Sequence, residues 1–323
     1  MNMALSLSSA VGKQVQPLVG NFQGSFSMEQ FFRRKEKVVI VMGATGTGKS
    51  RLAIDLATRF PAEIVNSDKI QAYEGLDVVT NKVTDEERRG VSHHLLGSID
   101  PNSNFSSHDF TYHASVAIES ILARDRLPIV AGGSNSYIEA LVDDWAESRF
   151  RYEFCFLWVD VSLPILQKFV SDRVDRMVDG GFVGEVREFF DPEGDYSRGI
   201  KRAIGVPELH DYLRAERDEA DERTLTILLE LAISKIKDNT CQLALRQLQK
   251  IRRLRNKRNW NLRRLDATGA FLTDGGNAND AWDKFVLQPS LRIVDQFLSD
   301  DGRLITTPIV SPEAAPLVAA VSR

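Results

Sequence analysis

The strongest chemical signal in this 323-residue chain is a glycine-rich run that matches the pattern G-x-x-x-x-G-K-[S/T]. The run is Gly43-Ala44-Thr45-Gly46-Thr47-Gly48-Lys49-Ser50, between an apolar β-branched segment and a segment with helical spacing. Glycines let such a loop curl so that its backbone N–H groups surround an anion, and the positive end of the following helix adds to the attraction. Lys49 supplies a full charge, and the Ser50 hydroxyl can ligate Mg²⁺. The run therefore predicts a binding site for a phosphate chain, without specifying which one.

A single acid, Asp68, closely follows the next apolar segment, Glu63-Ile64-Val65-Asn66. In open α/β sheets, ligands bind beyond the carboxyl ends of the strands, so this side chain is expected to face the phosphate loop. A carboxylate there can act as a general base or as a ligand of Mg²⁺. Aspartate is also favoured at helix N-caps, and position alone does not separate the two roles.

Short apolar segments are predicted to form the strands that position these groups, over residues 37–42, 63–66, 128–131 and 154–161. Helical spacing predicts helices over residues 49–60, 108–124, 136–145, 163–179, 182–190, 205–215, 222–258 and 281–299. Strands buried on both faces that alternate with helices are typical of parallel sheets. The sequence therefore predicts an α/β fold, with a P-loop NTPase-like parallel-sheet core and a helical C-terminal portion.

We expect four parts along the chain: an N-terminal segment (1–36), the P-loop core (37–161), a helical portion that completes the substrate channel (162–265) and a C-terminal extension (266–323). The first 28 residues contain no Asp or Glu and include several serines. This composition is typical of an organellar transit peptide, with an unstructured tail as the alternative. We expect a plastid location, with the cytosol as the alternative.

Composition argues against several classes of protein. Hydrophobic residues make up 43% and charged residues 27%, an ordinary balance for a folded soluble chain. The net charge of −4 disfavours a general nucleic-acid coat protein. The two cysteines, Cys155 and Cys241, are too few for a disulfide scaffold or a Cys-rich zinc site. No apolar run approaches the roughly 18 residues that span a bilayer, so we expect no membrane partner, and no protein partner is evident.

Several motifs, in order, resemble those of the isopentenyltransferase family, over a stretch from about Val38 to Arg255. Besides the phosphate loop they are NSDKIQAYEGLDVVTNK (66–82), GVSHHLLG (90–97), VAGGSNSYIEAL (130–141), RVDRMVDGGFVGEV (173–186), IKRAIGVPEL (200–209) and DNTCQLALRQLQKIRRL (238–254). They look most similar to the plant adenylate branch, which begins cytokinin synthesis. The resemblance implies transfer of a dimethylallyl group from dimethylallyl diphosphate to N6 of adenine in ATP or ADP, with AMP as a further candidate acceptor.

The resemblance also assigns roles to residues of the loop and its surroundings. Asp68 matches the family's general base, which takes the proton from the adenine amino group, and Thr45 matches a loop threonine beside the reacting groups. The loop itself matches the cradle for the donor's diphosphate. Lys49, Mg²⁺ at Ser50 and the backbone N–H groups would stabilise the charge that grows on this leaving group.

Three further positions bear on the substrates. Ser134 replaces a threonine that is usual in the tRNA-modifying branch, and it keeps a hydroxyl for the diphosphate. Lys69 stands where tRNA-type enzymes generally have serine, so contacts of that side chain are not carried over. Arg173 lies on a predicted helix, where it reaches the donor diphosphate or pairs with Asp172 or Asp175.

Cationic side chains are needed for the phosphates of the nucleotide, because the donor takes the loop. We predict this role for Arg149, Arg151 and Lys201, with solvated surface charge as the alternative. The adjacent His93 and His94 are expected to be structural or to line the substrate site, because no acid or cysteine cluster accompanies them.

The acceptor is predicted to be a free nucleotide and not tRNA. In tRNA-modifying relatives a helical insertion grips the anticodon stem, whereas here only residues 142–153 separate Leu141 from the strand that begins at Phe154. With Cys155 and Cys241 as its two cysteines and no histidine after His210, the chain is expected to form no C-terminal zinc finger. Eight basic residues within 250–264 favour RNA, although a helix end also favours cations.

Two alternatives remain at this point. The first is a tRNA dimethylallyltransferase. The second is a P-loop small-molecule kinase, in which Asp68 activates an acceptor hydroxyl. The kinase lacks a clear Walker B acid, because Ile129-Val130-Ala131 continues into two glycines and Asp160 follows a later strand.

Overall fold

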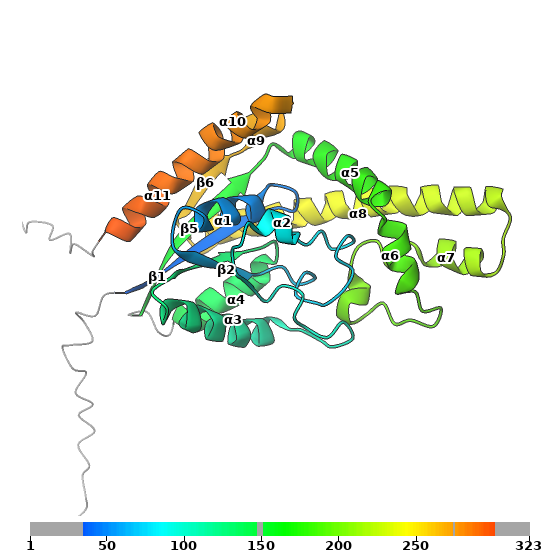
Figure 1. The fold of residues 1–323 in the computed structure, drawn as a ribbon, viewed down its shortest axis with the longest axis horizontal. Helices are drawn as coiled ribbons and strands as arrows, with labels where there is room; N and C mark the ends of the chain where they lie inside the picture. Colours follow the sequence, from blue (N-terminus) through cyan, green and yellow to red (C-terminus); the bar gives the residue numbers. More distant parts are fainter. Residues whose placement is uncertain (1–34, 147–150, 274, 301–323) are drawn as a thin grey trace, which may run out of the picture. The chain divides into compact units, whose positions relative to one another are not determined.

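The computed structural model describes residues 35–146, 151–273 and 275–300, and all of them belong to one compact unit. A six-stranded sheet forms its centre (Figure 1). The strand order is β3-β2-β4-β1-β5-β6, and every pairing is parallel. The strands are β1 (Glu36–Gly43), β2 (Ala62–Asn66), β3 (His93–His94), β4 (Leu127–Ala131), β5 (Tyr152–Asp160) and β6 (Leu262–Asp266). The predicted α/β fold with a parallel core is confirmed.

Two strands differ from the sequence prediction. β3 has only two residues, too few for a pattern to show. β6 lies at the end of the segment expected to be helical, and it pairs with β5 at the sheet edge. Its sequence, LRRLD, buries only the two leucines and exposes the arginines between them, so the apolar content is too low to indicate a strand.

The central strand β1 is buried on both faces, which explains its run of β-branched residues. Val38, Ile40 and Met42 face a core that includes α3 (Ser107–Leu122), α4 (Asn135–Ala146) and part of α8 (Glu222–Lys257). Val39 and Val41 face a second core, with α1 (Lys49–Ala57) and α11 (Gln288–Ser299). The sheet is therefore covered by helices on both sides.

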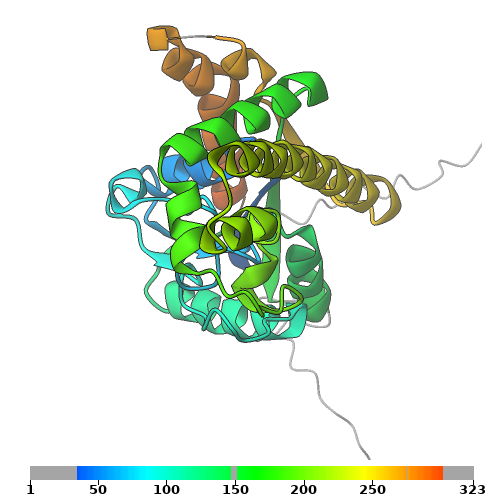
Figure 2. The ribbon, with the colours of Figure 1, turned by 90° about the vertical axis from the view of Figure 1, so that its right-hand side faces the viewer.

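The helical portion contains α5 (Leu163–Asp179), α6 (Phe182–Glu188), the 3-10 turn η2 (Gly199–Arg202), α7 (His210–Arg217) and α8. Figure 2 views the molecule from its side, where α5, α6 and α8 lie in front of the sheet. The helix predicted over 205–215 begins only at His210. The preceding residues turn at Gly205, whose φ is +111° and whose Cα lies against the Phe182 ring.

The C-terminal extension packs on the core. It contains α9 (Thr268–Phe271), η3 (Gly275–Asn277), α10 (Ala278–Trp282), the π-helical turn η4 (Asp283–Leu287) and α11. The last three segments account for the helix predicted over 281–299. The Lys37 ammonium donates to the carbonyls of Leu298 and Asp300 at 3.1 and 2.7 Å, which ties the end of α11 to the start of β1. None of the helices among the described residues has the length and apolar character needed to cross a membrane.

Candidate active site

The phosphate loop connects β1 to α1, as the motif predicted. Gly46 and Gly48 have φ of +82° and +90°, a conformation that favours glycine. Gly48 is the N-cap of α1, and no side chain of the described residues caps the helix there. The first N–H groups of a helix have no partner within it, so those that begin at Lys49 are available to an anion.

Lys49 is buried and turned back toward its own loop, where its ammonium donates to the Ala44 carbonyl at 2.8 Å. Burial lowers the pKa of Lys49 to about 8, while the nearby Asp68 raises it and Arg173 lowers it further. A bound diphosphate would favour the charged form of this lysine.

Asp68 lines the same cavity as the loop, because β1 and β2 end at the same edge of the sheet. Its Oδ1 accepts a hydrogen bond from the Ile70 N–H at 3.1 Å. Asp68 does not start a helix, because the residues after it form turns. The carboxylate is thus placed to meet a group bound next to the loop.

The turn after β4 approaches this carboxylate very closely. A Cβ on Gly132 would stand 2.3 Å from the carbonyl carbon of Ser67, which explains the glycine there. The Ser134 hydroxyl accepts a hydrogen bond from the Lys69 N–H at 2.8 Å. Gly132 and Gly133 line the cavity, whereas Ser134, predicted to touch the diphosphate, is not among its lining residues.

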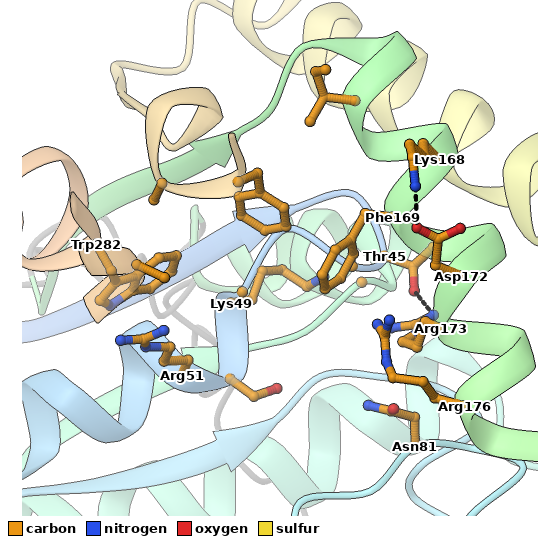
Figure 3. Close-up of a pocket in the computed structure, with 18 of the residues that line it drawn as sticks. Thr45, Lys49, Arg51, Asn81, Lys168, Phe169, Asp172, Arg173, Arg176 and Trp282 are labelled. Atoms are coloured by element: carbon orange, nitrogen blue, oxygen red, sulfur yellow. Dashed lines mark hydrogen bonds and ion pairs between the residues drawn. The ribbon is translucent and has the colours of Figure 1, made fainter. Parts of the chain in front are cut away.

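One wall of the cavity is α5. Arg173 donates to the Thr45 hydroxyl at 3.1 Å, and Arg176, one turn later, lies over the Phe169 ring (Figure 3). Burial and the neighbouring Arg176 lower the pKa of Arg173, and its buried Nε has no partner among the described residues. Asp172 and Asp175, the alternative partners, pair with Lys168 and Lys237 instead. Arg173 therefore faces the loop with unused hydrogen-bonding capacity.

The opposite wall comes from the C-terminal extension. Trp282 is 3% exposed, and its ring lies so close to Gly48 that a Cβ there would be 2.5 Å from it. The indole N–H donates to Asp55 at 2.9 Å, and the Arg51 guanidinium lies over the ring at 4.6 Å (Figure 3). Phe271 and Leu272 continue this apolar side of the cavity.

The resulting cavity has a volume of about 930 Å³, and its charge favours an anion. Five cationic and three acidic side chains line it: Lys49, Arg51, Lys168, Arg173 and Arg176, and Asp68, Glu87 and Asp172. Ser50, which was predicted to hold Mg²⁺, also lines it. The arrangement can bind a phosphate chain next to a carboxylate base.

Two of the three residues predicted for the nucleotide phosphates, Arg151 and Lys201, do not line this cavity. Arg151 precedes β5 and pairs with Glu119. It lies at the amino ends of the strands, whereas the cavity lies beyond their carboxyl ends. The two ends are seven strand residues, or about 23 Å, apart. Lys201 pairs with Asp191 at 3.2 Å and does not line the cavity. Arg149 lies outside the described residues.

Two other features of the sequence have structural roles. His94 binds the buried Glu63 at 2.7 Å, and His93 binds the Val91 carbonyl. In the basic stretch 250–264, Lys250 and Arg253 pair with Glu139 on α4, and further pairs form from Arg258 and Arg264. Much of that positive charge is therefore neutralised within the fold.

Sequence reasoning missed three residues of the site. Arg176 could have been found, since it stands one helical turn after Arg173. Gln247 accepts from the Thr45 N–H at 2.7 Å and donates to the Gly133 carbonyl at 2.9 Å. Gln247 and Trp282 could not be recognised from the sequence, because each acts through contacts with residues that are distant along the chain.

The chain matches the family model described as IPP transferase over residues 71–150 and 146–254. It is 60% identical to adenylate isopentenyltransferase 5, chloroplastic, of Arabidopsis thaliana over 321 residues, which cover 97% of each chain. It is 53% identical to adenylate isopentenyltransferase 7, mitochondrial, of the same plant, over 94% of this chain and 92% of the relative.

Among solved structures, the fold is similar to that of a eukaryotic dimethylallyltransferase acting on tRNA. The TM-score is 0.70 at 25% sequence identity, and the match covers 82% of this chain and 80% of the other.

Proposed function

Because the chain belongs to the IPP transferase family, we propose that it transfers the dimethylallyl group of dimethylallyl diphosphate to N6 of adenine in ATP or ADP, with AMP as a further acceptor. Diphosphate is the second product, and the reaction would be the first step of cytokinin synthesis. The observation that carries this proposal is the carboxylate of Asp68 in the same cavity as the phosphate loop.

The reaction requires a base for the proton of the acceptor and positive charge for the leaving diphosphate. The N6 amino group attacks C1 of the donor, the C1–O bond breaks with its electron pair on diphosphate, and Asp68 takes the proton lost from N6. Lys49, Arg173 and the loop N–H groups lie where the leaving diphosphate gains charge. The Thr45 hydroxyl, which lines the same cavity, accepts a hydrogen bond from Arg173.

The donor set of the cavity fits Mg²⁺ delivered with a diphosphate. Among the described residues there is no cluster of three or more His, Cys, Asp or Glu that could hold a metal by itself. Mg²⁺ commonly uses few protein ligands and completes its shell with substrate phosphates and water. We propose that the Ser50 hydroxyl holds it; when bound, Mg²⁺ neutralises charge on the leaving group.

A free nucleotide is our proposed acceptor. Supporting it are the similarity to two adenylate isopentenyltransferases and the short connection between α4, which ends at Ala146, and β5, which begins at Tyr152. Within the cavity wall, Lys168 and Arg176 are the cations that we propose for the acceptor's phosphates. The similarity to a tRNA-acting enzyme keeps tRNA as the second candidate.

Mass spectrometry of the products tests the function directly. The enzyme receives dimethylallyl diphosphate together with AMP, ADP, ATP and unmodified tRNA, and an Asp68→Asn variant serves as the matched control. We expect prenylated ATP or ADP from the wild type and little from the control. Prenylated tRNA formed with a higher kcat/KM than every nucleotide would contradict the acceptor, and γ-phosphoryl transfer from labelled ATP would favour the kinase.

We also propose an organellar location, in plastids. The support is the acid-poor first 28 residues and the similarity to relatives named chloroplastic and mitochondrial. Fusion of residues 1–36 to a fluorescent protein tests it: signal in plastids is expected, and diffuse cytosolic signal would contradict it.

A further inference from the structure

The side chain of Gln247, on α8, joins two loops of the site. Its Oε1 accepts a hydrogen bond from the Thr45 N–H at 2.7 Å, and its Nε2 donates to the Gly133 carbonyl at 2.9 Å. Thr45 lies in the phosphate loop after β1, and Gly133 in the turn after β4. Since β1 and β4 are neighbours in the sheet, one carboxamide holds together the loops that leave two adjacent strands.

The same amide lies close to Asp68. A Cβ on Gly133 would stand 2.6 Å from Gln247 Nε2 and 3.1 Å from Asp68 Oδ2, so the turn passes between the amide and the carboxylate with no room for a side chain. The turn is also bound to the segment of Asp68, because Ser134 accepts from the Lys69 N–H. A shift of Gly133 is therefore passed on to the carboxylate.

The carboxamide at this position satisfies both backbone partners. It presents one acceptor and one donor side by side, which matches an N–H and a carbonyl. An ionised glutamate would still accept from Thr45 but would set its second, acceptor-only oxygen against the Gly133 carbonyl. A methionine, of similar length, would leave both backbone groups without this partner.

We propose that Gln247 is a positioning residue that fixes the separation between the phosphate loop, which holds the donor, and Asp68, which takes the acceptor's proton. This inference rests on the proposed function. Gln247 acts through Thr45 and Gly133, and it makes α8 a part of the site although the helix contributes no reacting group.

The test compares Gln247→Glu and Gln247→Met with Gln249→Glu, which adds the same charge at an exposed position on the same helix. Both Gln247 variants should lose about 10²-fold in kcat with nucleotide affinity nearly unchanged, because misplacement of reacting groups by about 1 Å has that effect. Gln249→Glu should behave as the wild type.

The pH profile separates positioning from general damage to the fold. Gln247→Glu alone should move the acidic limb of kcat to higher pH by about one unit, because a second carboxylate near Asp68 disfavours its charged form. Lys49 and Arg173, which also face Asp68, are the same in all variants. Wild-type kcat and profile in Gln247→Glu would overturn the proposal.

Two further measurements cover the remaining outcomes. Where circular dichroism shows that Gln247→Glu does not fold, wild-type kcat in Gln247→Met overturns the proposal instead. Where the wild type itself transfers no prenyl group, the proposed function fails, and calorimetry with inorganic diphosphate then tests Gln247 without turnover. We expect Gln247→Met to bind diphosphate about tenfold more weakly than the wild type, because the variant loses the hydrogen bonds that shape the loop. Equal affinity of the two proteins for diphosphate would contradict the proposal.

Discussion

The carboxylate of Asp68 makes two kinds of contact, and one substitution can separate them. Its Oδ1 accepts from the Ile70 N–H, whereas Oδ2 faces Gly133 and the cavity. Asparagine keeps the acceptor for Ile70 but is far too weak a base for the adenine amino proton. We therefore expect Asp68→Asn to lower kcat by about 10²- to 10⁴-fold in steady-state assays. Calorimetry should show unchanged diphosphate binding, and a near-normal kcat would reduce Asp68 to a turn residue.

The lowered pKa of Lys49 predicts how kcat/KM for the donor depends on pH. Its pKa is lowered to about 8 by burial, and only the charged form attracts the diphosphate, so kcat/KM for the donor should fall as pH rises above about 8. Bound diphosphate favours the charged form, so the basic limb of kcat should lie at higher pH than that of kcat/KM. Lys49→Arg, which stays charged, should lack this limb, and an identical limb in that variant would assign it to another group.

The short helix α10, in the C-terminal extension, supports the phosphate loop through Trp282, a buried residue of the second core. Trp282 fills the space against Gly48, under Arg51, and its indole N–H binds Asp55. Trp282→Ala should lower the free energy of unfolding by about 3–5 kcal/mol, as measured in urea, because it removes a large buried side chain. The same variant should raise KM for the donor more than for the nucleotide.

Trp282→Phe is the matched control for this prediction. Phenylalanine keeps a ring against Gly48 and loses the hydrogen bond to Asp55, whose carboxylate still pairs with Arg89. The decrease in the free energy of unfolding and the increase in KM for the donor should therefore both be smaller than in Trp282→Ala. An alanine variant with wild-type stability and donor KM would show that α10 covers the loop without supporting it.

The charge distribution of the protein predicts weak binding of RNA. The net charge is −4, and several cations of the 250–264 stretch pair with acids on α4, β5 and β6. Fluorescence anisotropy with labelled unmodified tRNA at physiological salt should give a Kd no tighter than the non-specific range of about 10⁻⁶ to 10⁻⁴ M. Nanomolar binding that discriminates among tRNAs would contradict a free-nucleotide acceptor.

How much of this molecule follows from its sequence depends on whether a feature is local. The phosphate loop, the four buried strands and the helix that carries Arg173 each have a pattern of residue types, so spacing was enough to find them. Asp68 follows its strand and therefore lies at the carboxyl ends of the strands, where ligands bind. By the same rule Arg151, which precedes its strand, lies at the amino ends, so the sequence already argued against a role for Arg151 in nucleotide binding. Gln247 and Trp282 have no such pattern, because their partners lie more than 100 residues away.

The position of Trp282 has a consequence for the newly made chain. Trp282 is added to the chain more than 230 residues after Gly48, the glycine against which it packs. At about 5–20 residues per second, synthesis leaves the loop without this cover for about 10–50 s. The strand that completes the sheet edge, β6, is also made within the last fifth of the chain. A nascent polypeptide that ends before α10 therefore lacks one wall of the cavity, which is complete only once Trp282 has been added.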